Sequence, residues 1–241
     1  MNWRLQTFLN GLYDDLAYRA EFLIQIIGSA FIPVCMQLIL WRAMQQPELI
    51  SYTLISLLFT QIRGGDLDFT IQEMIRTGSL SQMLLRPVSV LEFIYLRGSA
   101  SRFLIAGIAS FIGLFFLPAQ NLLCAMLLAL CGNLIHYQVS ALCSIAAFYW
   151  EEAYSLLMVK NMCVSFLSGD MLPLSLLTTT LWQFLPFYLY VYEPVLIAQG
   201  KLSALQILTD FALAGAWILG LSFLIHICWR QGLKRYQSIG G

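Results

Sequence analysis

This chain of 241 residues is 59% hydrophobic and only 11% charged, which leaves too little polar surface to cover a water-soluble globule. Its formal net charge of zero gives no indication of a nucleic-acid partner. Composition and long apolar runs together predict an all-α polytopic membrane protein.

Residues 3–18 are too polar to span a membrane, but they carry an apolar stripe. Leu5, Leu9, Leu12 and Leu16 recur at helical spacing, and Asp14 lies off that stripe. The pattern predicts an amphipathic helix that lies in the membrane interface. The alternative is a helix that packs only on its own protein. The charged residues before the first apolar run argue against a cleavable signal peptide, so we expect that run to be retained.

Six longer apolar runs predict spanning helices, for which a bilayer requires roughly 20 residues each. They cover approximately residues 22–44, 49–70, 101–118, 121–149, 153–171 and 203–229. The second is the weakest, because Arg63, Asp66 and Asp68 occupy its far end and charges at mid-bilayer are costly. We therefore expect Gly64 and Gly65 near the inner surface.

The basic residues predict the orientation of these helices. Eleven of the thirteen fall in the N-terminal segment, in residues 63–102, after the turn at 151–152 and at the C-terminus. Only Arg42 and Lys201 fall on the other side. Because basic residues are retained inside, we expect a bacterial inner-membrane protein with both termini in the cytoplasm and the connection 118–120 outside.

Residues 172–200 form an apolar segment that prolines interrupt. Pro173, Pro186 and Pro194 divide it into pieces of about 12 and 7 residues, which are too short to cross a bilayer. The segment therefore predicts two half-helices that dip into the outer leaflet between the fifth and sixth spans, where protein or a cavity shields them. The alternative is an amphipathic surface loop.

Residues 72–102 form a long connection between two predicted spans. Ser79 has the character of an N-cap for a short helix over 79–85, and Pro87 ends that helix because Arg86, which precedes it, is disfavoured in the helical region. An apolar face on a cytoplasmic helix favours a docking partner. The alternative is a helix packed on the underside of its own bundle.

No motif predicts an enzyme. The sequence has no HExxH, no GxSxG, no GxxxxGK[ST] and no CxxC pair among its six cysteines. A membrane enzyme or a scaffold stays an alternative, with the carboxylate pairs at 66 and 68 and at 151 and 152 as its nearest candidates. A secondary transporter would be supported by an inverted repeat, and we find none.

Three polar residues lie in the fourth predicted span. Asn133, His136 and Gln138 are either candidate residues of a transport pathway or hydrogen-bonding links between helices. The sequence leaves both interpretations open.

The run IRTGSLSQMLLRPVSV at residues 75–90 resembles the cytoplasmic signature of ABC-2 type permeases. The later runs SGDMLPLSLL and LPFYLYVYEPVLIAQG and the ending GLKRYQSIGG resemble the same family in the same order. The chain departs from the family at residues 175–178, where an aromatic–proline pair is expected, and at Arg63 and Asp66.

The resemblance implies a half-transporter with a single transmembrane domain over residues 1–241. Residues 1–21 would form the interfacial helix, 22–229 the bundle and 230–241 a cytoplasmic tail. Two copies would pair as a homodimer in membrane lipid above two copies of a separate ABC ATPase subunit. ATP and Mg²⁺ would bind to that ATPase, and this chain would bind no cofactor and no nucleic acid.

The resemblance also implies roles for particular residues. The coupling helix, which would seat in a groove of the ATPase, would comprise Glu73, Arg76, Ser79, Leu80, Leu84, Leu85, Arg86 and Pro87. Its three leucines would fill the groove, and its charged residues would form a polar rim. An outer gate would comprise Pro173, Pro186, Glu193 and Pro194.

The resemblance further implies an exporter rather than an enzyme. Its cargo would be an antibiotic, an antimicrobial peptide or a similar amphiphile from the cytoplasm or inner leaflet, and export would also confer self-immunity. Export of a lipid-linked glycan is the alternative within the same class.

Overall fold

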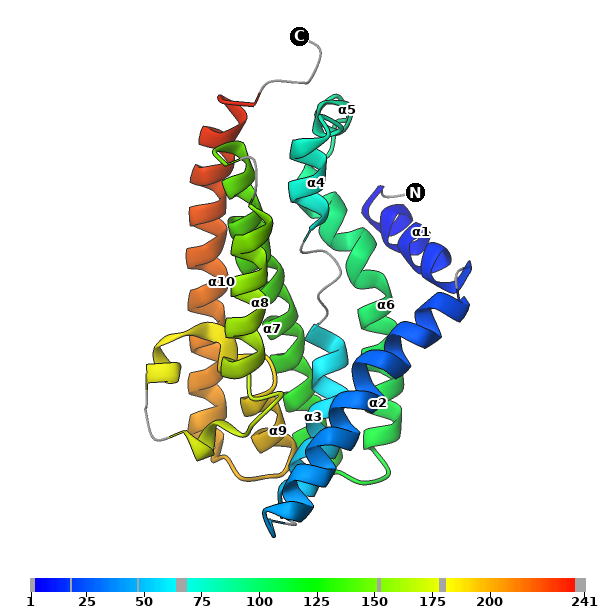
Figure 1. Cartoon of the computed structure of the whole chain (residues 1–241), viewed down its shortest axis with the longest axis vertical. Helices are drawn as coiled ribbons and strands as arrows, with labels where there is room; N and C mark the ends of the chain where they lie inside the picture. The colour runs from blue at the N-terminus through cyan, green and yellow to red at the C-terminus, as the bar shows by residue number, and fades with distance from the viewer. Residues whose placement is uncertain are drawn as a thin grey trace.

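The computed structural model describes residues 3–17, 19–46, 48–63, 69–150, 153–177 and 181–236, and it is all-α over these ranges (Figure 1). Its α-helices are α1 (Trp3–Ala17), α2 (Arg19–Ala43), α3 (Glu48–Arg63), α4 (Thr70–Arg76), α5 (Leu80–Leu84), α6 (Val90–Gly113), α7 (Ala119–Ile145), α8 (Tyr154–Leu167), α9 (Tyr192–Ala198) and α10 (Ala204–Leu233). Its 3₁₀ turns are η1 (Ala146–Phe148), η2 (Leu174–Leu176), η3 (Leu181–Phe184) and η4 (Pro186–Leu189). The predicted all-α fold is confirmed.

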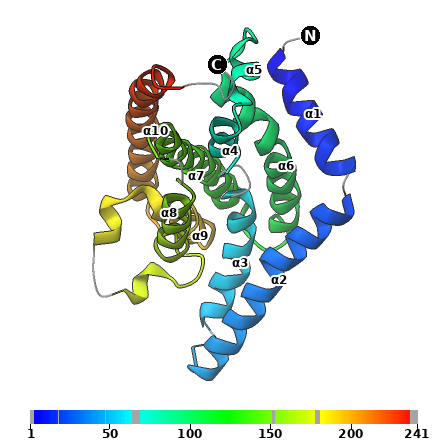
Figure 2. The same ribbon diagram turned by 45° about the horizontal axis from the view of Figure 1, so that its top comes forward.

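Two long helices of the described part, α7 with η1 and α10, are each 30 residues long and apolar enough to cross a membrane. They lie side by side (Figures 1 and 2). The most apolar stretch of α7 is 61% buried inside the protein, whereas that of α10 is only 17% buried. Therefore α7 is the central helix, and α10 covers it and leaves its own outer face open.

A capping box fixes the start of α10. The backbone N–H of Ser203 donates to Oε1 of Gln206 at 2.9 Å, and the backbone N–H of Gln206 lies 3.4 Å from Oγ of Ser203. These two bonds satisfy donors that would otherwise be unpaired at the helix N-terminus.

The helix that contains most of the third predicted span begins earlier than that span. Instead of beginning near residue 101, α6 begins at Val90, where Ser89 accepts the backbone N–H of Glu92 at 3.5 Å. The buried side chains of Val90, Ile94 and Ala100 favour this earlier start, because their apolar surfaces pack inside the protein. The connection that precedes α6 is therefore shorter than predicted and consists largely of α4 and α5.

The second and fifth predicted spans are shorter than expected. At 16 residues, α3 is roughly 24 Å long, which is less than the roughly 30 Å of a bilayer core. Similarly, α8 has 14 residues and ends before Gly169, whose φ of +85° turns the chain. Gly64 and Gly65, which we expected near the inner surface, lie outside the described part, as does the turn at 151–152. The number of spans stays a prediction.

The core has two parts at different levels of the bundle. The outer core gathers buried side chains of α3, α6, α7 and α10 with those of residues 174–198, including Phe59, Leu128 and Leu189. The inner core gathers those of α4, α5, α6, α7 and α10, including Leu80 and Ile145. Since α7 contributes to both, it connects the two levels.

The two ends of the bundle carry different elements. Helices α1, α4 and α5 lie toward the same end as the C-terminus of α10, whereas α9 and the turns that follow α2 and α6 lie at the opposite end (Figure 1). In the predicted topology the end that carries α1, α5 and the C-terminus of α10 is the cytoplasmic one, and this sidedness stays a prediction.

The N-terminal helix packs on α6. A side chain in place of Gly11 would clash with the backbone of Arg97, so glycine permits the close approach of the two helices. The ring centroids of Phe8 and Phe103 lie 5.8 Å apart. Leu5 and Leu16 are exposed, so part of the predicted apolar stripe faces away from the protein and suits a membrane interface.

Candidate functional site

The short helix α5 lies at one end of the bundle and is bounded as the sequence predicts. Gly78, with φ of +76°, turns the chain before it, and Pro87 follows its C-terminus. The predicted N-cap is wrong in its chemistry, because the Ser79 side chain makes no capping bond and its Oγ lies 3.0 Å from Oγ1 of Thr77. Its helical φ and ψ of −65° and −15° differ from the extended conformation of a capping residue.

The leucines of this segment face in different directions. Leu80 is 1% exposed and lies in the inner core, so the prediction that it fills a partner's groove is wrong. Leu84 and Leu85 are 41% and 87% exposed. One leucine therefore fixes the helix to the bundle, and the other two present an apolar surface to the outside.

Charged side chains of α4 and of the α5 segment are exposed, while their role as a rim stays a prediction. Nη2 of Arg76 lies 3.2 Å from Oε2 of Glu73, and both side chains are exposed. Arg86 and Pro87 are also exposed. We name the surface of Leu84, Leu85 and Arg86 the coupling surface.

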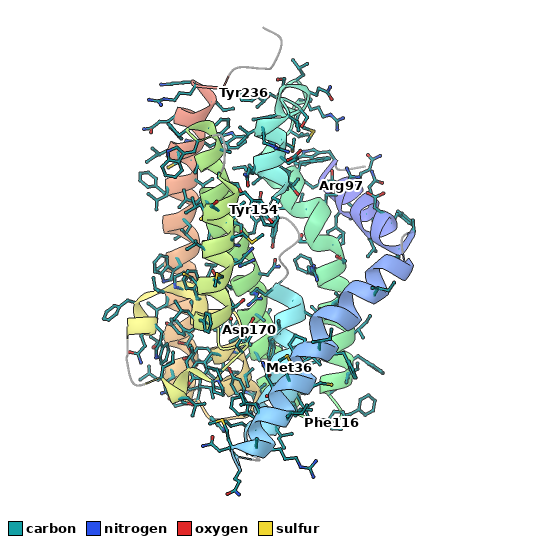
Figure 3. All side chains as sticks on the ribbon, in the orientation of Figure 1. Met36, Arg97, Phe116, Tyr154, Asp170 and Tyr236 are labelled. Atoms are coloured by element: carbon teal, nitrogen blue, oxygen red, sulfur yellow. The ribbon has the colours of Figure 1, made fainter. Side chains whose placement is uncertain are left out.

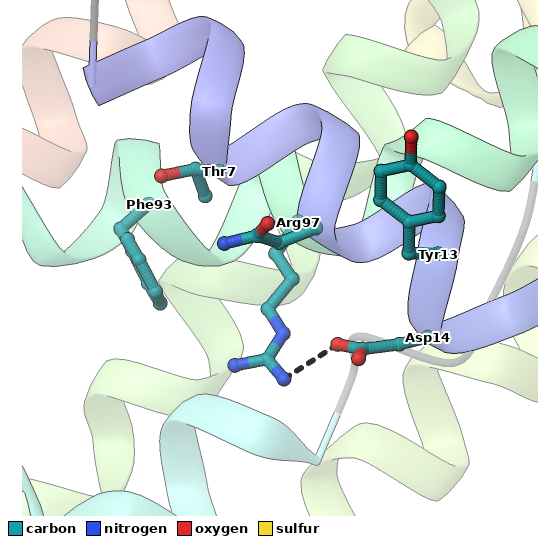
Figure 4. Close-up of a pocket in the computed structure, with 6 residues that line it drawn as sticks. Thr7, Tyr13, Asp14, Phe93 and Arg97 are labelled. Atoms are coloured by element: carbon teal, nitrogen blue, oxygen red, sulfur yellow. Dashed lines mark hydrogen bonds and ion pairs between the residues drawn. The ribbon is translucent and has the colours of Figure 1, made fainter. Parts of the chain in front are cut away.

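A groove lies beside α5, between α1, α4 and α6. It has a volume of about 420 Å³, and its lining is mostly apolar, with Met74, Met83 and Phe93 among its residues. At one side, Nη2 of Arg97 lies 2.7 Å from Oδ2 of Asp14, so an ion pair joins α6 to α1 (Figure 4). The groove thus combines apolar lining residues with one ion pair, between Arg97 and Asp14.

The prolines of the outer segment, residues 172–200, act differently from one another. Pro173 precedes η2 and Pro186 begins η4, so both mark the starts of short turns, as expected. Pro194 is the third residue of α9, where a missing N–H costs no helical bond, so the prediction that it breaks a helix is wrong. The predicted 12-residue half-helix is also wrong, since 3₁₀ turns replace it where the structure describes the chain.

The outer segment packs deeply against α7. A Cβ on Gly132 would lie 2.9 Å from the carbonyl oxygen of Leu189 and 3.0 Å from Cα of Tyr190, which shows how closely the backbones approach. Pro173, Pro186 and Pro194 are buried. Residues 186–198 therefore belong largely to the outer core, whereas residues 175–177 and 183–185 of the same segment are exposed.

Glu193 lies near the start of α9, among aromatic residues and close to α10. Burial raises its pKa to about 7, and the negative charge of Asp210 adds a smaller upward effect. Its Oε2 has no hydrogen-bond partner within the described residues. Its carboxyl group is therefore easier to protonate than one in water.

A buried ion pair, which the sequence did not reveal, joins α3 to the turn between α8 and the outer segment. Nη1 of Arg63 lies 2.6 Å from Oδ2 of Asp170 and 3.1 Å from Oγ of Ser168. The hydroxyl of Tyr52 donates to the carbonyl of Gly169 at 2.6 Å, and the amide of Gln37 donates to the carbonyl of Asp170 at 2.7 Å. Four side-chain bonds from α2 and α3 therefore hold residues 168–170.

The position of Arg63 corrects the predicted topology. Nδ2 of Asn133, near the middle of α7, donates to the carbonyl of Arg63 at 3.1 Å, so the arginine lies at mid-length of the bundle rather than at the end predicted to be cytoplasmic. Two more residues of the predicted cytoplasmic set also form hydrogen bonds inside the bundle. Nζ of Lys160 donates to Ser140 of α7 at 2.9 Å, and Nη1 of Arg102 lies 3.5 Å from the carbonyl of Gln61. The eight basic residues that remain on the predicted cytoplasmic side still outnumber the two on the other.

The three polar residues of α7 connect it to its neighbours. Asn133 accepts a hydrogen bond from the hydroxyl of Tyr95 at 3.0 Å and donates to carbonyls at the end of α3. Gln138 donates to Oγ of Ser222 on α10 at 2.7 Å, and the His136 ring lies edge-to-face with Tyr190, 5.5 Å between centroids. These contacts favour the role of links between helices, while their part in a pathway stays a prediction.

In the described ranges, no three His, Cys, Asp or Glu side chains are arranged to hold a metal ion. The carboxylate pairs that the sequence offered to an enzyme, at residues 66 and 68 and at 151 and 152, lie outside those ranges.

Comparison with known proteins identifies the family. A family model described as "ABC-2 family transporter protein" matches residues 47–240, which include α5, its coupling surface and the outer segment. No curated protein and no solved structure matches the chain. Because the match covers well over half of the sequence, and the all-α fold with its long apolar helices agrees with it, the chain belongs to the ABC-2 transporter family of membrane permeases.

Proposed function

We propose that this chain is the permease subunit of an ATP-driven exporter and that a separate ABC ATPase docks on its coupling surface. The observation that carries the proposal is the exposure of Leu84 and Leu85 on a helix whose first leucine is buried. Burying a leucine side chain contributes about 1.5–3 kcal/mol, so two adjacent leucines offer a partner a substantial apolar contact.

The seating of α5 suits the transmission of force. Leu80 packs in the inner core with Ile75 of α4, Ile94 of α6 and Ile145 of α7. Closely packed side chains transmit displacement because they leave little free volume. A partner that pushes on Leu84 and Leu85 would therefore move several helices rather than α5 alone.

The remaining parts of the transporter follow from this assignment. Two copies of the permease would form a homodimer in the bacterial inner membrane, with both termini in the cytoplasm and two ATPase subunits beneath. ATP and Mg²⁺ would bind to the ATPase, and the permease would have no catalytic residue. The outer segment, part of which packs on α7, would close the pathway on the outside, with Glu193 at the start of α9 within it.

The cargo would be an amphiphile that enters from the cytoplasm or the inner leaflet, such as an antibiotic or an antimicrobial peptide. The groove beside α5 supports this class, because its apolar residues could hold an acyl or aromatic group while Arg97 and Asp14 contact a polar one. Export and self-immunity would then be the same activity.

Co-purification with the ATPase tests the proposal. Leu84→Asp/Leu85→Asp should abolish capture of the ATPase subunit, because it places two carboxylates in an apolar contact. Leu84→Met/Leu85→Met preserves volume and should retain capture. Gln6→Asp/Asn10→Asp adds the same charge to exposed positions of α1 and serves as the electrostatic control. Capture of the ATPase by the double aspartate variant of α5 would refute the docking site.

A further inference from the structure

The last residue that the structure describes contacts the turn before α5. The hydroxyl of Tyr236 donates to the carbonyl of Gly78 at 2.8 Å, and its oxygen lies 3.0 Å from Oγ of Ser81. A phenol has a single proton, which goes to Gly78, so Ser81 donates to the tyrosine oxygen. Tyr236 lies at the same end as α5, beyond α10 (Figures 1 and 3).

Tyr236 is itself fixed to the end of α10. Its backbone N–H donates to the carbonyl of Gly232 at 3.1 Å. Its ring lies edge-to-face with Phe148, 5.9 Å between centroids, and Phe148 contacts Trp229 of α10 in the same way at 5.6 Å. A side chain at Gly232 would overlap the Phe148 ring, so glycine at this position permits the arrangement.

The two hydrogen bonds of Tyr236 occur at the point where α5 begins. The Gly78 carbonyl also accepts the backbone N–H of Ser81 at 3.2 Å, so it belongs to the first turn of the helix. Leu80, which lies between the two bonded residues, fills the inner core. The coupling helix is thus held by the side chain of Leu80, which packs in the inner core, and by the hydroxyl of Tyr236, which follows α10.

We propose that Tyr236 is a positioning residue that joins α10 to the coupling helix, so that a displacement of α5 is passed directly to α10. This inference rests on the proposed function, because it requires an ATPase that moves α5. The Tyr236 hydroxyl touches neither the coupling surface nor the groove, so its removal should leave docking intact and should uncouple α10.

Amide hydrogen exchange in the full permease–ATPase complex tests the inference. In the wild-type complex, a non-hydrolysable ATP analogue with Mg²⁺ should change exchange in α5 and in the C-terminal turns of α10 together. In Tyr236→Phe, α5 should still respond, and the response of α10 should fall by roughly fivefold or more, because both hydrogen bonds of the tyrosine hydroxyl are lost. Ser81→Ala removes the second bond and should reduce the same response in part.

Tyr13→Phe is the matched control, since Tyr13 is an exposed tyrosine of α1 at the same end. It should behave as the wild type. If the role of Tyr236 were purely structural, Tyr236→Phe would lower the melting temperature, and α5 and α10 would still change their hydrogen exchange together. If α10 in Tyr236→Phe responds as in the wild type, the inference is wrong and the proposed function stands. If no ATPase binds the wild-type permease, both are wrong.

Discussion

The guanidinium of Arg63 and the carboxylate of Asp170 form an ion pair of 2.6 Å between the end of α3 and the turn that follows α8. Their side chains are only 14% and 11% exposed. Asp170 lies well inside the bundle rather than at either end (Figure 3). Removing two charged groups from water at this depth costs free energy, and their mutual attraction offsets that cost. The loss of either partner would therefore leave the other buried charge uncompensated.

We expect Arg63→Met to destabilise the protein by roughly 3–5 kcal/mol, because it leaves the Asp170 carboxylate buried without its partner. Asp170→Asn should have a smaller effect, since the amide can still accept a hydrogen bond from Arg63. Unfolding in detergent measures both. In the double variant Arg63→Met/Asp170→Leu most of the stability lost in Arg63→Met should return, and a double variant less stable than Arg63→Met would contradict an interaction between the two side chains.

Substitution of the buried Leu80 should affect stability, whereas substitution of the exposed Leu85 should affect docking of the ATPase. Leu80→Ala should lower the free energy of unfolding by about 2–5 kcal/mol, because it opens a cavity in the inner core. Leu85→Ala should change it by no more than about 0.5 kcal/mol and should weaken capture of the ATPase. Thermal unfolding and co-purification of the same two variants provide the comparison. An equal loss of stability in both would mean that Leu85 is not free to contact a partner.

The sequence predicted the position of α5 well, because its limits depend on local chemistry. Gly78 and Pro87 impose backbone conformations that few other residues adopt, and both act on their immediate neighbours. Which leucine faces the bundle could not be predicted in the same way. A five-residue helix is too short to show a periodic stripe, so only the tertiary packing of Leu80 decides its orientation.

Arg63 illustrates why the predicted topology was partly wrong. A count of basic residues assumes that each lies at a membrane surface, whereas the partner of Arg63 is 107 positions away in the sequence. Nothing in the residues around Arg63 indicates Asp170. The prolines of the outer segment likewise predicted interruptions, but their position within each turn, as for Pro194, depends on packing against α7.

Stability should depend on pH through Glu193. Its folded pKa is raised from 4.5 to about 7, so the folded protein binds this proton more tightly than the unfolded chain does. The contribution to stability is therefore fully present below pH 4.5 and is lost as the pH rises through about 7. In Glu193→Gln the melting temperature should depend less on pH over this range. If the melting temperature of the wild type rose as the pH increased from 4.5 to about 7, and that of the variant did not, the pKa of Glu193 would not be raised in the folded protein.

Close approach of the outer segment to α7 predicts opposite effects for two glycine-to-alanine substitutions. Gly132→Ala places a methyl group 2.9 Å from the Leu189 carbonyl and 3.0 Å from Cα of Tyr190, both backbone atoms, so the segment must shift and stability should fall by about 1–3 kcal/mol. Gly220→Ala in α10 meets nothing within 4 Å and should be neutral or stabilise the helix by up to about 1 kcal/mol. Both substitutions add the same methyl group to a long apolar helix, so propensity alone would give them the same sign. A melting temperature that falls only for Gly132→Ala therefore reports the contact between α7 and the outer segment, and a rise for both variants would show that the segment does not pack on α7 at this point.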